Sequence, residues 1–299
     1  MTRAEMIEKA NIIRERDQFG AMTPEEVAAL PGTDVEMQIP VRDGRTVRVY
    51  EVRPDASLEK GCPMIINFHG GGFIKVRSER DRRYCVNMAT YLNCLVWDVD
   101  YSLAPEYPFP TAVHEAYDVL AYAFDHAEEI GVDANRIALA GHSAGGSLVA
   151  AALIQAAGNE KIKPCCALME YFVADLTVPP AEKLTPELKA DPKWVQRAGV
   201  EEQYNLFYAS PEQVHDPLVS SVLASDEVMA TFPPSMVLAA GMDTLRLENE
   251  AFAARLARLG VPVTACTLTE SMHGFTINLR PGWEKAYDLH KRFFKSYMY

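Results

Sequence analysis

The sequence predicts an α/β protein with a mostly parallel central sheet, helices on both faces and a helical cap. Short apolar runs such as 63–68 and 137–140 alternate with longer segments of helical periodicity. The runs are continuously apolar, which is typical of buried strands, and their alternation with helices favours a parallel sheet. Between 175 and 232, prolines interrupt short helical pieces, which indicates an insertion that covers the sheet rather than extends it.

The first thirty residues are predicted to be helical. The expected apolar face consists of Ala4, Ile7, Ile12, Ile13 and Phe19. Thr23 followed by Pro24 is typical of the capped start of a second short helix. Residues 34–40 and 46–53 alternate in polarity like strands, and Asp43-Gly44 between them predicts a hairpin.

The remaining elements follow in order. Strands are expected at 63–68, 93–100, 137–140, 165–172, 235–240 and 261–268, and helices at 112–130, 144–157, 194–208, 247–259 and 283–297. A proline-rich loop, 101–110, cannot continue regular structure. We therefore divide the chain into an N-terminal helical segment (1–33) that contributes to the cap, a core (34–174 and 233–299) and a cap insertion (175–232).

Composition excludes several classes of partner. The 299 residues, 48% of them apolar, suffice for one large domain or two small ones. With 29 basic and 41 acidic residues the formal charge is −12, and the absence of a basic cluster argues against binding to nucleic acid or an anionic membrane. Neither a membrane span nor a signal peptide is expected from the sequence. The six cysteines show no C-x-x-C spacing, so we expect free thiols in a cytoplasmic protein.

A nucleophile turn is the first chemical signal. Residues 141–145 (GHSAG) fit the pattern G-x-S-x-G, between a predicted buried strand and a predicted helix. In that setting the serine, here Ser143, lies on a sharp turn and presents its hydroxyl above the sheet. The alternative is a glycine-rich strand-to-helix turn with an ordinary serine, and the pattern alone leaves it open.

An acid and a base follow at other predicted strand ends. Asp243 comes directly after strand 235–240, and His273 lies in the loop after the last strand. The chain order of Ser143, Asp243 and His273 is serine, acid, histidine. Taken singly, the aspartate is as typical of a helix cap and the histidine of a surface loop. The three in this order at strand ends favour a catalytic triad.

The segment 69–72 (HGGG) predicts the donors that a developing oxyanion needs. Glycines let main-chain N–H groups approach such a charge, although a flexible turn is the simpler alternative. We expect Gly71, Gly72 and Ala144 to supply these donors, with His69 and Gly70 in supporting positions.

These motifs together resemble the hormone-sensitive lipase family of α/β-hydrolases, in particular its bacterial carboxylesterases. The segments that carry the resemblance are 69–72 (HGGG), 100–106 (DYSLAPE), 141–146 (GHSAGG), 240–243 (AGMD) and 273–275 (HGF). The match runs from about residue 34 to the C-terminus. It implies the α/β-hydrolase fold, hydrolysis of short-chain acyl esters, no cofactor and an assembly that is often a homodimer.

The chain departs from the family pattern at two positions. The family usually has Asp where this chain has His142, and Arg where it has Ser102. We assign His142 a structural or pocket-shaping role and expect Ser102 to remove a charged contact. Glu106 resembles a family position that orders the site through hydrogen bonds, which is a supporting role.

The sequence thus predicts a serine carboxylesterase that acts on a small-molecule ester. An amidase or arylformamidase on the same scaffold is the alternative enzyme, and a non-catalytic ligand-binding receptor is the alternative outside enzymes. The candidates for lining the substrate pocket are Phe73, Tyr171, Phe172, Trp194, Tyr204, Phe207, Tyr208 and Leu245. We expect no metal site, because no His or Cys residues show ligand spacing. No catalytic role is expected for His114, His126, His215 and His290.

Overall fold

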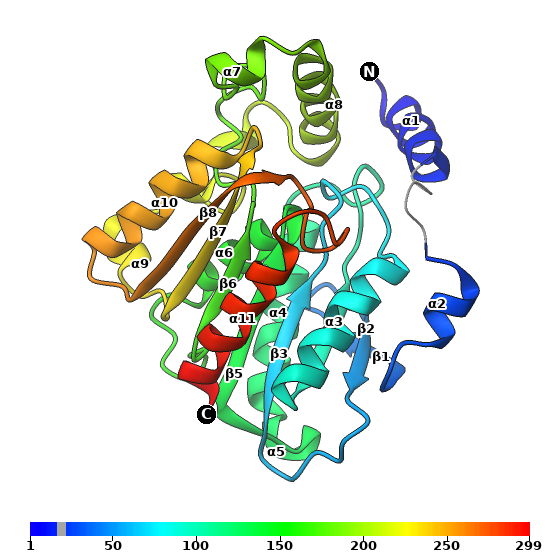
Figure 1. Ribbon diagram of the computed structural model, residues 1–299, viewed down its shortest axis with the longest axis vertical. Coiled ribbons are helices and arrows are strands. Elements are labelled where there is room, and N and C mark those ends of the chain that lie inside the picture. The colour runs from blue at the N-terminus through cyan, green and yellow to red at the C-terminus, as the bar shows by residue number, and fades with distance from the viewer. Residues whose placement is uncertain (17–21) are drawn as a thin grey trace.

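The computed structural model describes residues 1–16 and 22–299, and in this part of the chain eight strands form one sheet in the order β1-β2-β4-β3-β5-β6-β7-β8 (Figure 1). The strands are β1 (Thr33–Pro40), β2 (Thr46–Arg53), β3 (Cys62–Phe68), β4 (Leu95–Asp100), β5 (Val132–His142), β6 (Ala167–Glu170), β7 (Ser235–Met242) and β8 (Val263–Met272). Strands β3 to β8 run parallel, whereas β1 and β2 join the edge of β4 as an antiparallel hairpin. The predicted α/β fold with a mostly parallel sheet is confirmed.

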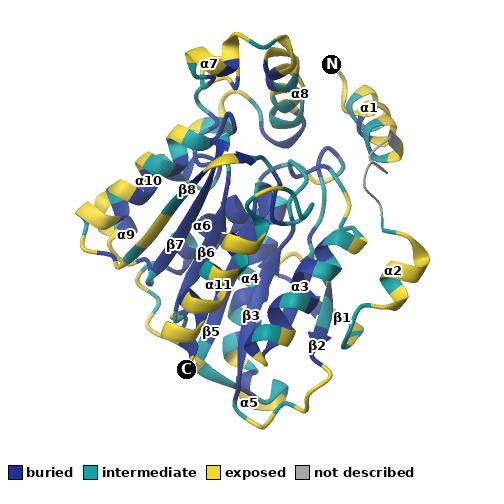
Figure 2. Ribbon diagram, viewed as in Figure 1, coloured by how far each residue is buried: buried dark blue, intermediate teal, exposed yellow. Residues whose placement is uncertain are grey.

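Helices cover both faces of the sheet (Figure 1). They are α1 (Arg3–Arg16), α2 (Pro24–Ala28), α3 (Glu79–Leu92), α4 (Thr111–Asp125), α5 (Ala127–Ile130), α6 (Ala144–Ala156), α7 (Pro186–Lys189), α8 (Pro192–Tyr208), α9 (Asp226–Met229), α10 (Arg246–Arg258) and α11 (Trp283–Met298). Helices α3 and α11 pack on one face, and α4, α6 and α10 pack on the other. Figure 2 shows the strands buried between them and the exposed residues on the outer sides of the helices.

Burial explains why the central strands are predominantly apolar. All seven residues of β3 are buried, as are all four of β6, because each of these strands has a helix layer above and below it. The outer hairpin differs, since most residues of β1 are exposed to solvent and Ile39 is buried in the core. The cap predicted at Thr23 is confirmed at the start of α2, where Thr23 and Glu26 form a capping box.

Several predicted boundaries were wrong. Helix α3 has no counterpart among the expected elements. The segment 112–130 forms two helices, α4 and α5, with a break at His126. The strand expected at 165–172 ends at Glu170, because Tyr171 adopts a φ of 32°, which lies outside the extended region.

The apolar face predicted for the first helix is only partly correct. Met6, Ala10 and Ile13 of α1 pack against the core, whereas Ala4 and Ile12 are exposed. Phe19, which was also placed on this face, lies outside the described residues.

The carboxyl ends of the parallel strands converge on one end of the molecule. Helices α1, α7 and α8 lie beyond these strand ends, as does the N-terminus (Figure 1). In open α/β sheets this edge is where ligands bind. Within the described ranges, no helix has both the length and the apolar character that a membrane crossing requires.

Candidate active site

Ser143 lies at the turn between β5 and α6. Its backbone has φ 54° and ψ −126°, a conformation that non-glycine residues rarely adopt. The surroundings hold this turn, because the Ser143 N–H donates to the carbonyl oxygen of Glu170 at 2.9 Å. Residues in such strained conformations concentrate at functional sites.

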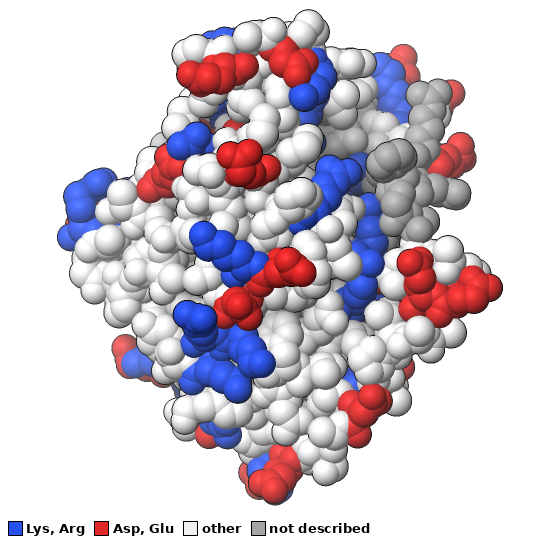
Figure 3. All heavy atoms as spheres, viewed as in Figure 1, with Lys and Arg blue, Asp and Glu red and all other residues white. Residues whose placement is uncertain are grey.

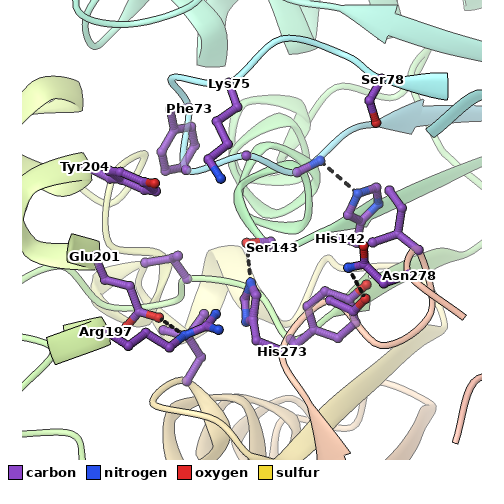
Figure 4. A pocket seen from close by; sticks show the side chains of 18 of the residues that line it. Phe73, Lys75, Ser78, His142, Ser143, Arg197, Glu201, Tyr204, His273 and Asn278 are labelled. Carbon is purple, nitrogen blue, oxygen red and sulfur yellow. Dashed lines mark hydrogen bonds and ion pairs between the residues drawn. The ribbon is translucent and has the colours of Figure 1, made fainter. Parts of the chain in front are cut away.

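Three side chains meet above the sheet in one chain of hydrogen bonds. His273 Nε2 lies 2.9 Å from Ser143 Oγ, and His273 Nδ1 lies 2.7 Å from Asp243 Oδ2. Figure 4 shows His273 reaching Ser143 at the floor of the cavity. The structure therefore brings together the serine, the base and the acid that the sequence places at three separate strand ends.

Burial of the acid fixes the orientation of the imidazole. The Asp243 side chain is fully buried behind His273, and its second oxygen lies 3.4 Å from the Leu245 N–H. The neighbouring Thr244 hydroxyl donates to Glu201 of α8 at 2.7 Å, which ties this loop to the helix above it. A carboxylate held this way keeps the proton of a neutral histidine on Nδ1 and leaves Nε2 to accept the serine proton.

Gly71, Gly72 and Ala144 lie around the same serine. Gly71 and Gly72 line the cavity together with Ser143 and have φ values of 123° and 60°, which favour glycine. A Cβ atom on Gly72 would lie 2.5 Å from Tyr204 Cδ2, so a side chain there would collide with the Tyr204 ring of α8. Ala144 is the first residue of α6, and its N–H has no acceptor within the helix.

The segment 69–72, which we call the glycine loop, is held in place by contacts of His69 and Gly70. The His69 ring stacks on Tyr101 with the ring centres 4.4 Å apart, and its carbonyl accepts the Tyr101 hydroxyl at 2.9 Å. The Gly70 N–H donates to His142 Nε2 at 2.9 Å. His142 thus binds the glycine loop rather than Ser143, which fits the structural role expected for it.

Asp81 of α3 completes this arrangement. Its Oδ1 lies 3.2 Å from His142 Nε2, and its Oδ2 accepts from the Ser78 N–H at 2.7 Å and from the Ser78 hydroxyl. Burial acts to raise the pKa of Asp81, but the hydrogen bonds that its carboxylate accepts outweigh burial and hold that pKa well below its usual value. No sequence pattern marked Asp81, because α3 was not predicted.

The lowered pKa makes a pH-dependent prediction. Asp81→Asn is expected to reduce the free energy of unfolding by about 3 kcal/mol at pH 7, because it removes a buried, hydrogen-bonded carboxylate. A carboxyl group whose pKa is depressed stabilises the fold above its unfolded-state pKa, and this contribution is lost as the pH falls through the folded-state value. The difference in the free energy of unfolding between wild type and Asp81→Asn should stay constant from pH 7 to 5 and become smaller below about pH 4.

Urea unfolding at several pH values would test this prediction. Asp125→Asn, at an exposed position on α4, is the matched control and should change stability by less than about 0.5 kcal/mol. If the loss of unfolding free energy in Asp81→Asn grew as the pH fell, it would contradict a depressed pKa for Asp81 in the folded protein.

Glu106 does not line the cavity. Both of its carboxylate oxygens accept hydrogen bonds from Arg14 of α1, at 2.7 and 2.8 Å, and Arg14 also donates to the carbonyl oxygens of Ile74 and Ala104. The hydrogen bonds from Arg14 lower the pKa of Glu106. Arg14 itself lines the cavity, so Glu106 supports the site indirectly, by holding this side chain of α1 in place.

Ser102 lies beside a charged contact, although this chain lacks the arginine that the family usually has at position 102. The Ser102 hydroxyl donates to Glu115 at 2.7 Å, and Arg45, from the end of the β1–β2 hairpin, lies 2.9 Å from the same carboxylate. A guanidinium therefore reaches this position from elsewhere in the sequence.

The cavity above Ser143 has a volume of about 370 Å³ and lies between the core and α8 (Figure 4). Of the aromatic and aliphatic candidates, Phe73, Tyr171, Tyr204 and Leu245 line it. The other four are not on its lining: Phe172, Trp194, Phe207 and Tyr208. Phe172, Phe207 and Tyr208 are buried in the main core, and Trp194 is buried in a separate small cluster, which is the commoner place for aromatic side chains. In the part of the chain that is described, no group of three or more His, Cys, Asp or Glu side chains is placed to hold a metal ion.

The mostly parallel sheet and the serine turn define the α/β-hydrolase class. A family model described as the alpha/beta hydrolase fold matches residues 65–277. An arylesterase of Saccharolobus solfataricus is 30% identical over 246 residues, which cover 82% of this chain and 77% of the relative. An ethyl acetate hydrolase of Pseudomonas putida is 30% identical over 243 residues, 80% of this chain and 74% of the relative. The chain belongs to the α/β-hydrolases, and its predicted place in their hormone-sensitive lipase group is confirmed.

Solved structures agree with this placement. An esterase of Pyrobaculum calidifontis superimposes with a TM-score of 0.85 at 29% identity, covering 96% of this chain and 92% of that one. A thermophilic carboxylesterase cloned from a metagenomic library gives a TM-score of 0.80 at 29% identity, with 99% and 96% covered.

Proposed function

We propose that this protein is a serine carboxylesterase that hydrolyses short-chain acyl esters through Ser143, His273 and Asp243. The hydrogen-bond chain from Ser143 Oγ through His273 to Asp243 is the observation that carries the proposal. The similarity to an arylesterase and to an ethyl acetate hydrolase supports the same class of reaction.

The reaction begins at the serine. Ser143 Oγ attacks the ester carbonyl while His273 Nε2 accepts its proton, and Asp243 orients the imidazole and stabilises its cation. The tetrahedral intermediate collapses, its C–O bond to the alcohol breaks, and His273 returns the proton to the leaving oxygen. Water then attacks the acyl-enzyme with His273 again as the base, and the acid and free Ser143 are released.

The N–H groups of Gly71, Gly72 and Ala144 stabilise the oxyanion in this mechanism. They are main-chain donors, so they are in place before the charge develops and need no reorganisation. Each such donor contributes roughly 3 kcal/mol to lowering the barrier. The contact between Gly70 and His142 holds the loop that presents two of them.

Helices α1, α7 and α8 form the cap in this proposal, from the segments 1–33 and 175–232. The lining of the cavity includes Arg14 of α1. It also includes residues from successive turns of α8: Arg197, Glu201 and Tyr204. A cavity of about 370 Å³ bounded partly by α1 and α8 is near the lower limit of ligand sites, which favours a small acyl group.

Initial rates with p-nitrophenyl esters from acetyl to dodecanoyl test the proposal. We expect kcat/KM to be highest between acetyl and about hexanoyl and to fall for longer chains, because the cap limits the space beside Ser143. A maximum at dodecanoyl would contradict the short-chain part. Turnover of a matched p-nitroanilide instead of the esters would favour the amidase, and binding without turnover would favour the receptor.

A further inference from the structure

Glu170, the last residue of β6, places a carboxylate after three apolar strand residues. Its side chain is completely buried beneath α3 and α11, which lie side by side on this face of the sheet (Figure 1). The charged side chains of α11 lie instead along its outer side, where Figure 3 shows Lys, Arg, Asp and Glu at the surface. Burial of a carboxylate is unfavourable unless hydrogen bonds compensate it, so Glu170 is expected to have polar partners.

The main chain of Glu170 holds the turn at Ser143. Its carbonyl oxygen accepts the Ser143 N–H at 2.9 Å. In the ladder between β5 and β6, Glu170 lies opposite His142, the residue before Ser143. Tyr171 follows directly, and its N–H donates to the carbonyl oxygen of Leu238 in β7 at 2.6 Å. The position of Ser143 is therefore fixed against the end of β6.

The side chain of Glu170 reaches the loop that carries His273. Its Oε2 accepts the hydroxyl of Thr276, three residues after His273, at 3.3 Å, and the Tyr171 hydroxyl lies 2.5 Å from the Thr276 hydroxyl. A carboxylate only accepts and each hydroxyl has one proton, so Tyr171 donates to Thr276 and Thr276 donates to Glu170. The Tyr171 ring also packs edge-on against the His273 ring, with the centres 5.0 Å apart. Both neighbours of the imidazole are thus connected to Glu170.

Two buried side chains of the helix layer hold the carboxylate itself. The Tyr84 hydroxyl of α3 donates to Glu170 Oε2 at 2.7 Å, and His290 Nε2 of α11 lies 3.0 Å from Oε1. Burial acts to raise the pKa of Glu170, whereas His290 and the Tyr84 hydroxyl act to lower it, and the net effect is a lowered pKa. Glu170 is therefore ionised at neutral pH and held from both helices.

We propose that Glu170 is a positioning residue that fixes the separation of Ser143 and His273. Its carbonyl oxygen holds the serine turn, and its carboxylate holds the histidine loop through Thr276. The inference rests on the proposed esterase function and adds a residue that is not among the described residues lining the cavity. Proton transfer to His273 needs Nε2 within hydrogen-bond reach of Ser143 Oγ, here 2.9 Å. A misplacement of about 1 Å can lower the rate by about 100-fold.

Glu170→Met removes both acceptor oxygens and keeps most of the side-chain volume. We expect it to lower kcat/KM for p-nitrophenyl butyrate by about 10-fold or more, because the histidine loop loses its connection to the serine turn. Butyl 4-nitrophenyl ether lacks the scissile carbonyl, and its inhibition constant should stay near the wild-type value, because the cavity lining is unchanged. Rates are expressed per active site, titrated with a serine-directed phosphonate, so that loss of folded protein is not counted.

Glu170→Gln is the conservative variant. It keeps one oxygen that can accept from Tyr84 and from Thr276, so it should retain most of the wild-type kcat/KM. A difference between the two Glu170 variants separates the lost acceptor from the lost charge.

Thr276→Val tests the connection without changing the buried carboxylate. Valine has nearly the shape of threonine and lacks the hydroxyl, so kcat/KM should fall about as far as in Glu170→Met, whereas Thr276→Ser should retain most of it. In the double variant of Glu170→Met and Thr276→Val the two losses should not multiply, because both changes remove the same hydrogen bond.

Glu115→Met is the matched control. Glu115 is also a buried carboxylate, but it accepts from Ser102 and contacts Arg45, away from Ser143 and His273. This variant should lose stability, because it leaves buried polar partners without their acceptor, and keep kcat/KM per active site near the wild-type value.

The outcomes distinguish this inference from the esterase proposal. If wild type hydrolyses the butyrate ester and folded Thr276→Val keeps the wild-type kcat/KM, Glu170 does not position the histidine loop, and this result holds even where Glu170→Met does not fold. An equal loss in Glu170→Gln and Glu170→Met would also overturn the inference, as would a rise in the inhibition constant that accounts for the whole loss. If wild type does not hydrolyse the ester, the esterase proposal fails first, and this inference fails with it.

Discussion

Replacing Ser143 with alanine is expected to lower kcat for a short-chain ester by about 10³-fold or more, with the fold intact. The change removes the atom that forms the acyl-enzyme, so His273 and Asp243 have no nucleophile to activate. Any residual rate comes from the oxyanion donors and from substrate binding. Little strain is added, because alanine loses only a hydroxyl that bonds to His273.

The measurement is the steady-state rate with p-nitrophenyl acetate, together with labelling by a serine-directed phosphonate and mass spectrometry. Ser147→Ala is a control on the same helix, since the Ser147 hydroxyl donates to the Val173 carbonyl at 2.7 Å and not to the triad. That variant should keep turnover within about 10-fold and should still be labelled at Ser143. Full turnover by Ser143→Ala would exclude the proposed nucleophile.

Gly145→Ala is expected to lower the free energy of unfolding by about 3 kcal/mol or more. A Cβ atom at Gly145 would lie 1.8 Å from the carbonyl oxygen of Phe68 and 2.7 Å from that of His69. Both contacts are to backbone, so no side chain can rotate away, and α6 or β3 must move. Because β3 leads directly into the glycine loop, esterase activity should fall together with stability.

Gly199→Ala on α8 is the matched control. A Cβ atom there meets nothing within 4 Å, and the residue lies inside an exposed helical turn. Alanine should raise the free energy of unfolding by about 0.5–1 kcal/mol, because it lowers the conformational entropy of the unfolded chain. Urea unfolding of both variants compares the two directly. A Gly145→Ala protein as stable as wild type would show that the close packing of β3 on α6 is not required.

The sequence alone determined the parallel core and the order of the chemical residues. Predominantly apolar runs identified β3 and β7, because strands covered on both faces have few positions that face water. Three strand ends carried Ser143, Asp243 and His273, and parallel strands bring their carboxyl ends to one edge of the sheet. The local sequence pattern therefore predicted where these residues lie along the chain. Their hydrogen bonds followed from the topology of the parallel sheet, which brings the three strand ends together.

Only the tertiary structure decided what surrounds them. Asp81 contacts His142 across 61 positions of sequence. Arg14 reaches Glu106 from helix α1, near the other end of the printed sequence from the catalytic histidine. Polar residues such as these look like ordinary surface side chains in the sequence, since no periodicity marks a charged side chain that points inward. Their roles depend on which elements pack together. The local sequence pattern indicates which face of each helix or strand is buried, but it does not indicate which other element packs against that face.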